Sequence, residues 1–113
     1  MPRSLCDRLA DVLSALDRAE RFGRRDRSDD VVVAAILHEL TVVGEAVSVL
    51  LRDDPDLLER RPDIPWRGVV GMRNRLVHEY ENVEPAYVWG TVDDDLQPLR
   101  LAVDSERDRL ACA

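Results

Sequence analysis

Several residue types are absent or rare in this chain of 113 residues. All sixteen basic residues are arginine, aromatic residues make up only 4%, and there are two cysteines, Cys6 and Cys112. Two cysteines near opposite ends give neither a disulfide framework nor a cluster of metal ligands, so we expect no disulfide scaffold and no metal site. Hydrophobic residues nevertheless make up 45% and charged residues 35%. That balance excludes a disordered chain and predicts one globular domain over residues 1–113.

The sequence also appears without a long hydrophobic run. No apolar stretch reaches the ~18 residues that a membrane span requires, and the N-terminus lacks the apolar core of a secretory signal. We therefore expect a cytoplasmic protein with no membrane partner. The net charge of −7 argues against bulk electrostatic binding of nucleic acid, which basic proteins usually provide. Any RNA contact must use a local arginine patch, and the alternative is a protein partner.

Regular alternation of polar and apolar residues, the mark of a strand, is not sustained anywhere, whereas helical spacing is common. Residues 4–7 have the spacing of a capping box and predict a first helix that ends near Gly23. A second helix should cover about residues 30–51, with Gly44 in its middle. Glycine inside a helix costs ~1 kcal/mol relative to alanine. A close approach of another helix at Gly44 would compensate for that cost.

The second half of the chain predicts three further helices. Ile64-Pro65-Trp66 reads as the entry of a third helix that extends through Tyr80. Pro85 should begin a short fourth helix, with Asp93-Asp94-Asp95 at its end, and Pro98 should open the last one. The three adjacent acids point in different directions, so we interpret them as a solvated cap and not as a metal site. The sequence thus predicts an all-α fold, an antiparallel bundle of four to five helices.

The segment that carries chemistry lies at the end of the third predicted helix and reads Arg73-Asn74-Arg75-Leu76-Val77-His78-Glu79-Tyr80. At about 100° per residue, Arg73 and Tyr80 share one helix face, and Asn74 and His78 share the neighbouring face. The four side chains would form one broad polar strip. A second copy related by two-fold symmetry would double the arginines and histidines around one groove.

Such a strip fits the cleavage of RNA, which carries its own nucleophile in the 2′-hydroxyl. The reaction needs a base, an acid and positive charge at the phosphate. A histidine such as His78 titrates near neutral pH and can serve as acid or base. The fork of Arg73 can bind phosphate and stabilise developing charge. The chemistry needs no metal and no cofactor. From geometry alone, the same residues could also be a surface histidine, paired arginines and a core-edge tyrosine.

The order Arg73, four residues, His78, one residue, Tyr80 resembles the signature of the HepT-like branch of the HEPN superfamily. The flanking blocks resemble that family as well, and the similarity extends from about Leu37 to Leu101. These blocks are Val43-Gly44-Glu45-Ala46, Ile64-Pro65-Trp66, Gly71-Met72-Arg73-Asn74, Val83 to Trp89 and Leu96 to Leu99. The short Arg and His pattern alone is weakly specific, but its combination with Tyr80 and the ordered blocks is fairly specific.

The resemblance implies an all-α homodimer that acts as the ribonuclease toxin of a toxin–antitoxin pair. Arg73 and His78 would line a cleft at the dimer interface. The antitoxin would be an MntA-like nucleotidyltransferase, which in such pairs can transfer AMP from ATP to the motif tyrosine, here Tyr80. An anionic adduct beside Arg73 and His78 would block entry of the RNA phosphate.

Four further residues are candidates around this motif. Asn74 would orient His78 or donate to phosphate, and Glu45 on the second helix would support Arg73 or His78 from behind. Arg67 and Arg75 would extend an RNA-binding rim. For Glu45 a structural salt bridge is the better interpretation, and the rim arginines can equally be solvated surface charges.

Two alternatives to a nuclease remain open. One is a non-catalytic HEPN module that holds nucleotide or RNA, or docks a nucleotidyltransferase. The acidic net charge of −7 favours it mildly, whereas an intact Arg73 and His78 pair favours the nuclease. The other is a plain helical dimerisation protein, which leaves the Arg–Asn–His–Tyr strip unexplained.

Overall fold

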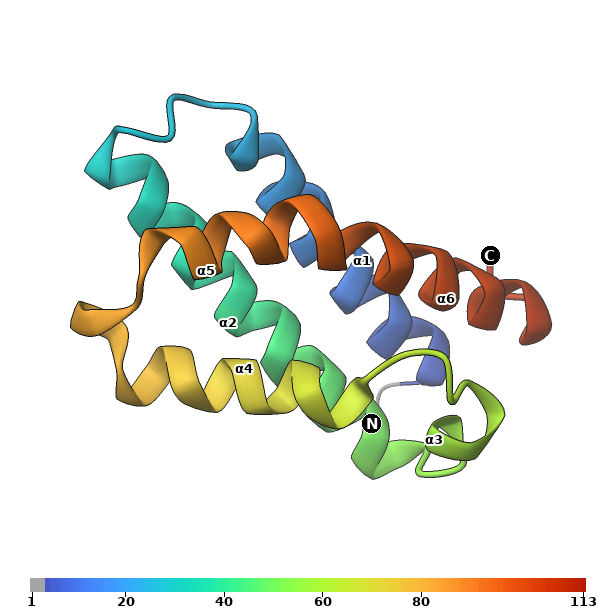
Figure 1. The fold of residues 1–113 in the computed structure, drawn as a ribbon. Coiled ribbons are helices and arrows are strands. Elements are labelled where there is room, and N and C mark those ends of the chain that lie inside the picture. The colour runs from blue at the N-terminus through green and yellow to red at the C-terminus, as the bar shows by residue number, and fades with distance from the viewer. Residues whose placement is uncertain (1–3) are drawn as a thin grey trace.

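A computed structural model describes residues 4–113 and shows an all-α bundle, with no strand in that part of the chain. The elements in order are α1 (Leu5–Gly23), α2 (Asp30–Asp53), α3 (Leu57–Arg60), α4 (Trp66–His78), a 3₁₀ turn (Tyr80–Asn82), α5 (Pro85–Gly90), a π-helical turn (Thr91–Asp95) and α6 (Leu96–Arg109). Figure 1 shows α2 crossing behind α4 and the rod formed by α5 and α6. The predicted fold class is confirmed.

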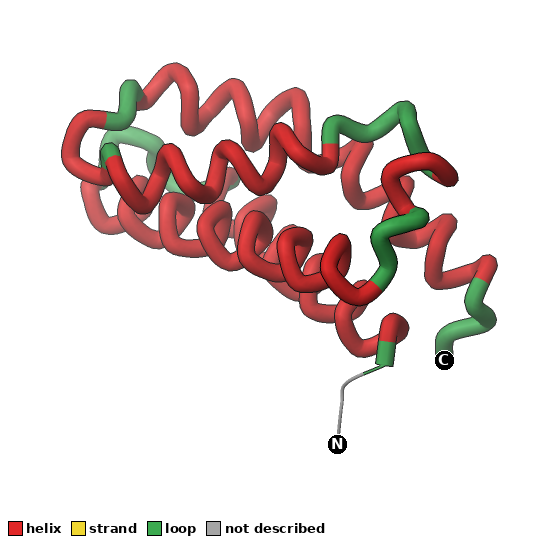
Figure 2. Tube along the Cα trace, turned by 90° about the horizontal axis from the view of Figure 1, so that it is seen from below, coloured by secondary structure: helices red, strands yellow, loops and turns green. Residues whose placement is uncertain are grey.

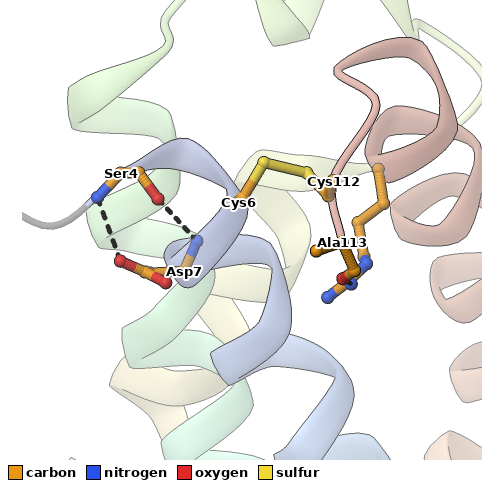
Figure 3. Close-up of a disulfide and its surroundings, with 6 residues drawn as sticks. Ser4, Cys6, Asp7, Cys112 and Ala113 are labelled. Carbon is orange, nitrogen blue, oxygen red and sulfur yellow. Dashed lines mark hydrogen bonds between the residues drawn. A yellow bond between two sulfur atoms is a disulfide. The ribbon is translucent and has the colours of Figure 1, made fainter.

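The first helix begins where the sequence predicted. The backbone N–H of Asp7 donates to Oγ of Ser4 over 3.1 Å, and the N–H of Ser4 donates to the Asp7 carboxylate over 3.3 Å (Figure 3). This reciprocal pair satisfies two N–H groups that a helix start leaves without partners. Leu9, Val12 and Leu16 then point into the core.

The last two predicted helices are one continuous rod (Figure 1), and Figure 2 shows a trace made of helices and loops. Helix α5 passes through the π-helical turn directly into α6, so Pro98 lies inside a helix and does not open one. Proline lacks an N–H and its ring collides with the preceding turn, so it interrupts a regular helix. The wider turn changes the hydrogen-bond register just before Pro98, which lets the rod continue.

Helix α2 is the central helix of the bundle and contacts both α1 and α4. It contains a window of mean hydropathy 1.7 that is long and apolar enough, by length and composition, to cross a membrane. The expectation that no such stretch exists was therefore wrong. In the structure 39% of that window is buried inside the protein. Its apolar side chains Ile36, Leu40, Val43 and Val47 form the middle of the core.

Two buried carboxylates hold the helices together, and local sequence gave no sign of either. Arg18 on α1 donates to Glu39 on α2 over 2.7 Å, and Arg60 donates to Glu106 on α6 over 2.7 Å. Burial raises the pKa of Glu106, but the hydrogen bonds from Arg60 and Arg109 outweigh it and hold that pKa below its ordinary value. Glu106 therefore stays ionised at neutral pH, and the pair fixes α3 against α6.

The two cysteines form a disulfide that joins α1 to the chain beyond α6 (Figure 3). The sequence predicted no disulfide scaffold, and it gave no sign of this single bridge. Cys6 and Cys112 are 106 residues apart in sequence, so no local pattern connects them. An up-and-down bundle with an even number of long rods returns the chain to the end where it began. That topology brings the start of α1 beside the end of α6.

Candidate functional site

Arg73 lies on the side of α4 that faces α2, and Gly44 makes this position possible. A Cβ added at Gly44 would lie 2.9 Å from Cγ of Arg73 and 3.2 Å from its Cα, with Cβ of Arg73 nearer still. The predicted close approach at Gly44 is confirmed. The residue that approaches Gly44 is the arginine of the motif. Because Gly44 has no side chain, the base of the Arg73 side chain can lie directly against α2.

Glu45 and Asn74 set the direction of the Arg73 side chain. The carboxylate of Glu45 forms an ion pair with Nε of Arg73 at 3.3 Å, and Nη1 of Arg73 donates to Oδ1 of Asn74 over 3.0 Å. The prediction that Glu45 supports Arg73 from α2 agrees with this contact. The Glu45 side chain is 59% exposed, so solvent screens the pair and its contribution to stability is small. Its main effect is on the orientation of the guanidinium.

The Nε–H of Arg73 is buried and, among residues 4–113, has no hydrogen-bond acceptor. The Glu45 carboxylate is close enough for Coulomb attraction, but the N–H does not point at it. A buried donor without an acceptor is unfavourable and uncommon in proteins. The Arg73 side chain is 33% exposed, so part of it reaches solvent. A phosphate could therefore approach the guanidinium group, whose planar N–H groups suit phosphate oxygens.

His78 is the last residue of α4, and its side chain is exposed. With helical spacing, His78 lies about 140° from Arg73 around α4, on the same outward face as Asn74 and Arg67. No hydrogen bond joins His78 to Arg73 within the described chain. The structure therefore brings Arg73, Asn74 and Glu45 together and leaves His78 free at the end of the helix.

Tyr80 does not continue α4, contrary to the prediction. The helix ends at His78, and Tyr80 begins a separate 3₁₀ turn. Its side chain is 52% exposed, and that of Val77 is 47% exposed. The shared helix face of Arg73 and Tyr80 was therefore a wrong inference. The tyrosine side chain is nevertheless half exposed, two residues beyond His78.

The two rim arginines have different surroundings. Arg67 is exposed on the outward face of α4 and has no ion pair among the described residues. Arg75 lies about 80° from Arg67 around α4: its guanidinium carbon lies 4.2 Å from the centroid of the Tyr87 ring, and its Nε donates to Glu79 over 3.1 Å. Arg75 thus links α4 to α5 through Tyr87. Arg67 is exposed and unpaired within residues 4–113, which is compatible with the predicted RNA-binding rim. The role of Tyr87 could not be foreseen, because only the fold brings α5 to this side of α4.

Comparison with known proteins decides which family these residues belong to. A family model described as Ribonuclease HepT-like matches residues 6–106. The chain belongs to the HepT-like ribonuclease family. This agrees with the resemblance inferred from the motif and its flanking blocks.

Several relatives of the HepT-like chain carry names that describe them as ribonucleases. The protein named "Probable ribonuclease HepT" of Thermococcus cleftensis is 32% identical, over 88% of this chain and 93% of its own length. "Putative RNase TTE0752" of Caldanaerobacter subterraneus subsp. tengcongensis is 32% identical over 66% of this chain and 64% of its own. "Putative RNase MJ0125" of Methanocaldococcus jannaschii is 29% identical over 81% of each chain. No solved structure matches the chain significantly.

Proposed function

We propose that this HepT-like protein is a metal-independent endoribonuclease and the toxin of a type VII-like HEPN/MNT toxin–antitoxin pair. The observation that carries the proposal is the arrangement of the motif in a member of a ribonuclease family. Arg73 is held by Glu45 and Asn74 with a side chain that is 33% exposed, and His78 is exposed on the same helix. The Nε–H of Arg73 is a buried donor without an acceptor among the described residues, which is uncommon for an arginine that serves structure alone.

In the proposed reaction the imidazole of His78 takes the proton from the 2′-hydroxyl of the RNA. The resulting oxyanion attacks the adjacent phosphorus, the bond to the 5′-oxygen of the next nucleotide breaks, and a cyclic 2′,3′-phosphate remains. A proton must be delivered to the leaving 5′-oxygen. Arg73 stabilises the charge that builds on the non-bridging phosphate oxygens.

One histidine cannot hold and release a proton at the same instant, which is a chemical reason for a homodimer. A second copy placed by a two-fold axis against the outward face of α4 would add a second His78. One imidazole could then act as base and the other as acid. The exposed Val77, which lies between Arg73 and Asn74 around the helix, supplies apolar surface beside this face for such a contact. Light scattering tests this, and a strict monomer that cleaves RNA would rule out the shared cleft.

The nuclease proposal is tested by incubating the purified protein with total RNA in EDTA. The chelator inactivates contaminating nucleases that depend on a metal ion. We expect cleavage by the wild type and none by Arg73→Ala. Arg25→Ala is the matched control, since it removes the same charge from the exposed loop between α1 and α2. Wild-type protein of unmodified mass that leaves RNA intact would favour the alternative, a HEPN module that binds nucleotide or RNA, or docks a nucleotidyltransferase, without cutting.

We further propose that an MntA-like nucleotidyltransferase silences the toxin by transferring AMP to Tyr80, in the cytoplasm and without a membrane partner. The half-exposed side chain of Tyr80 supports this, and the added phosphate would compete with RNA for Arg73. In that compartment the Cys6–Cys112 disulfide of the structure would be open to reduction.

Co-expression with an MntA-like nucleotidyltransferase should therefore increase the intact mass by one adenylate and abolish cleavage. Tyr80→Phe should keep the unmodified mass and remain active, and Tyr87→Phe is the control that retains the acceptor. Addition of the adenylate to Tyr80→Phe would show that another residue is the target.

A further inference from the structure

An apolar groove of about 460 Å³ runs between α4 and the rod of α5 and α6, on a different side of α4 from Arg73 and His78. Its floor is Val43 of α2, and its walls include Val69 and Met72 of α4 and Leu99 of α6. In Figure 1 these two walls lie side by side in front of α2. The volume is within the range of sites that bind a compact apolar group.

The groove exists because small residues face it where a bundle would normally be filled. Gly68 lines it without a side chain, and a Cβ added there would meet only Cβ of Pro65, at 3.5 Å. Across the groove stand Thr91, the first residue of the π-helical turn, and Pro98, which follows that turn. Helix α4 packs on α2 and α6 packs on α1, and the space between α4 and α6 is left open.

The charge around the groove is negative, which limits what can occupy it. Asp63 and Asp95 are its ionisable lining residues apart from Tyr87, and none is basic. Hydrogen bonding from Arg61 lowers the pKa of Asp63, but the Arg61 guanidinium pairs with that carboxylate at 2.9 Å and offsets its charge. Asp95 is exposed and has no ion pair within the described chain. An RNA phosphate would be repelled here.

We propose that this groove, defined by Val43, Gly68, Met72, Asp95 and Leu99, is the docking site for an amphipathic helix of a partner protein that carries large apolar side chains next to an arginine or lysine. A groove between two helices with a third beneath is the place that one more helix of a bundle would take. The apolar residues of the partner fill the space, and its basic residue meets Asp95.

A second copy of this chain is the poorer occupant. The chain carries a net charge of −7, and a two-fold contact at the groove would bring the Asp95 carboxylates of both copies together. The groove is also on a different face of α4 from Asn74 and His78. A docked helix would therefore leave the proposed RNA-cutting residues accessible, and the inference does not rest on the ribonuclease proposal.

The test is a selection from a displayed library of short helical peptides against the full-length protein. We expect the selected peptides to combine large apolar residues with arginine or lysine. They should bind Gly68→Leu at least about tenfold more weakly, because the added side chain fills the groove. This variant should fold, since leucine favours a helix more than glycine does. Gly71→Leu is the matched control: it adds the same side chain to α4 where nothing lies within 4 Å, and binding should be unchanged.

Reversal of the rim charge provides the second measurement. Asp95→Arg should weaken the binding of the same peptides and make that binding less sensitive to salt. Selection of acidic peptides, or equal binding to wild type and Gly68→Leu, would overturn the proposal. So would loss of self-association in Gly68→Leu, because a second copy would then be the occupant.

Discussion

Replacing His78 with alanine should lower the rate of RNA cleavage by about 10²–10⁴-fold, the usual contribution of general acid–base catalysis. The side chain is exposed at the end of α4 and packs against nothing in the core, so stability should change by less than about 0.5 kcal/mol. Initial rates on a fluorescent RNA oligonucleotide in EDTA, together with thermal unfolding, separate these two effects. The large loss of rate should occur without a shift in Tm.

Added imidazole gives a further control on this result. If His78 transfers protons, free imidazole should restore part of the activity of His78→Ala, because it supplies the missing group. The same additive should do nothing for Arg73→Ala, whose defect is charge stabilisation. A His78→Ala protein that cleaves RNA at the wild-type rate would remove His78 from the mechanism.

Replacing Gly44 with alanine should impair both stability and cleavage, because the new Cβ collides with the base of Arg73. Overpacking of this kind costs about 1–3 kcal/mol, and the better helix propensity of alanine returns about 1 kcal/mol. The net loss in the free energy of unfolding should be up to about 2 kcal/mol. A displacement of Arg73 by about 1 Å can reduce the rate by about 10²-fold.

Gly71→Ala is the matched control for stability, since it is also a glycine inside a helix but has nothing within 4 Å of the added Cβ. It should be stabilised by up to about 1 kcal/mol. If Gly44 acts by positioning Arg73, the two substitutions should not be additive. In the Arg73→Ala background, Gly44→Ala should therefore cause little further loss of activity. Equal stability of Gly44→Ala and Gly71→Ala would show that α2 and α4 tolerate the extra methyl group without strain.

The position of the motif on its helix shows how far spacing alone can be trusted. Helical periodicity correctly placed Asn74 and His78 on one outward face of α4. It failed at Tyr80, because a helix ends where its last carbonyls find other partners, and the 3₁₀ turn that follows begins at Tyr80. Element ends depend on such competing hydrogen bonds and are the least predictable part of a helix.

By itself the sequence determined the all-α class, the start of α1 at its capping box and the family signature of Arg73, His78 and Tyr80. These are properties of residues near one another in the chain, where helix periodicity and capping act. Only the tertiary structure decided that Gly44 and Glu45 hold Arg73, and that Cys6 meets Cys112. It also opened the groove beside Gly68 and joined α5 to α6. Those outcomes depend on how whole helices cross and pack, which no local spacing contains.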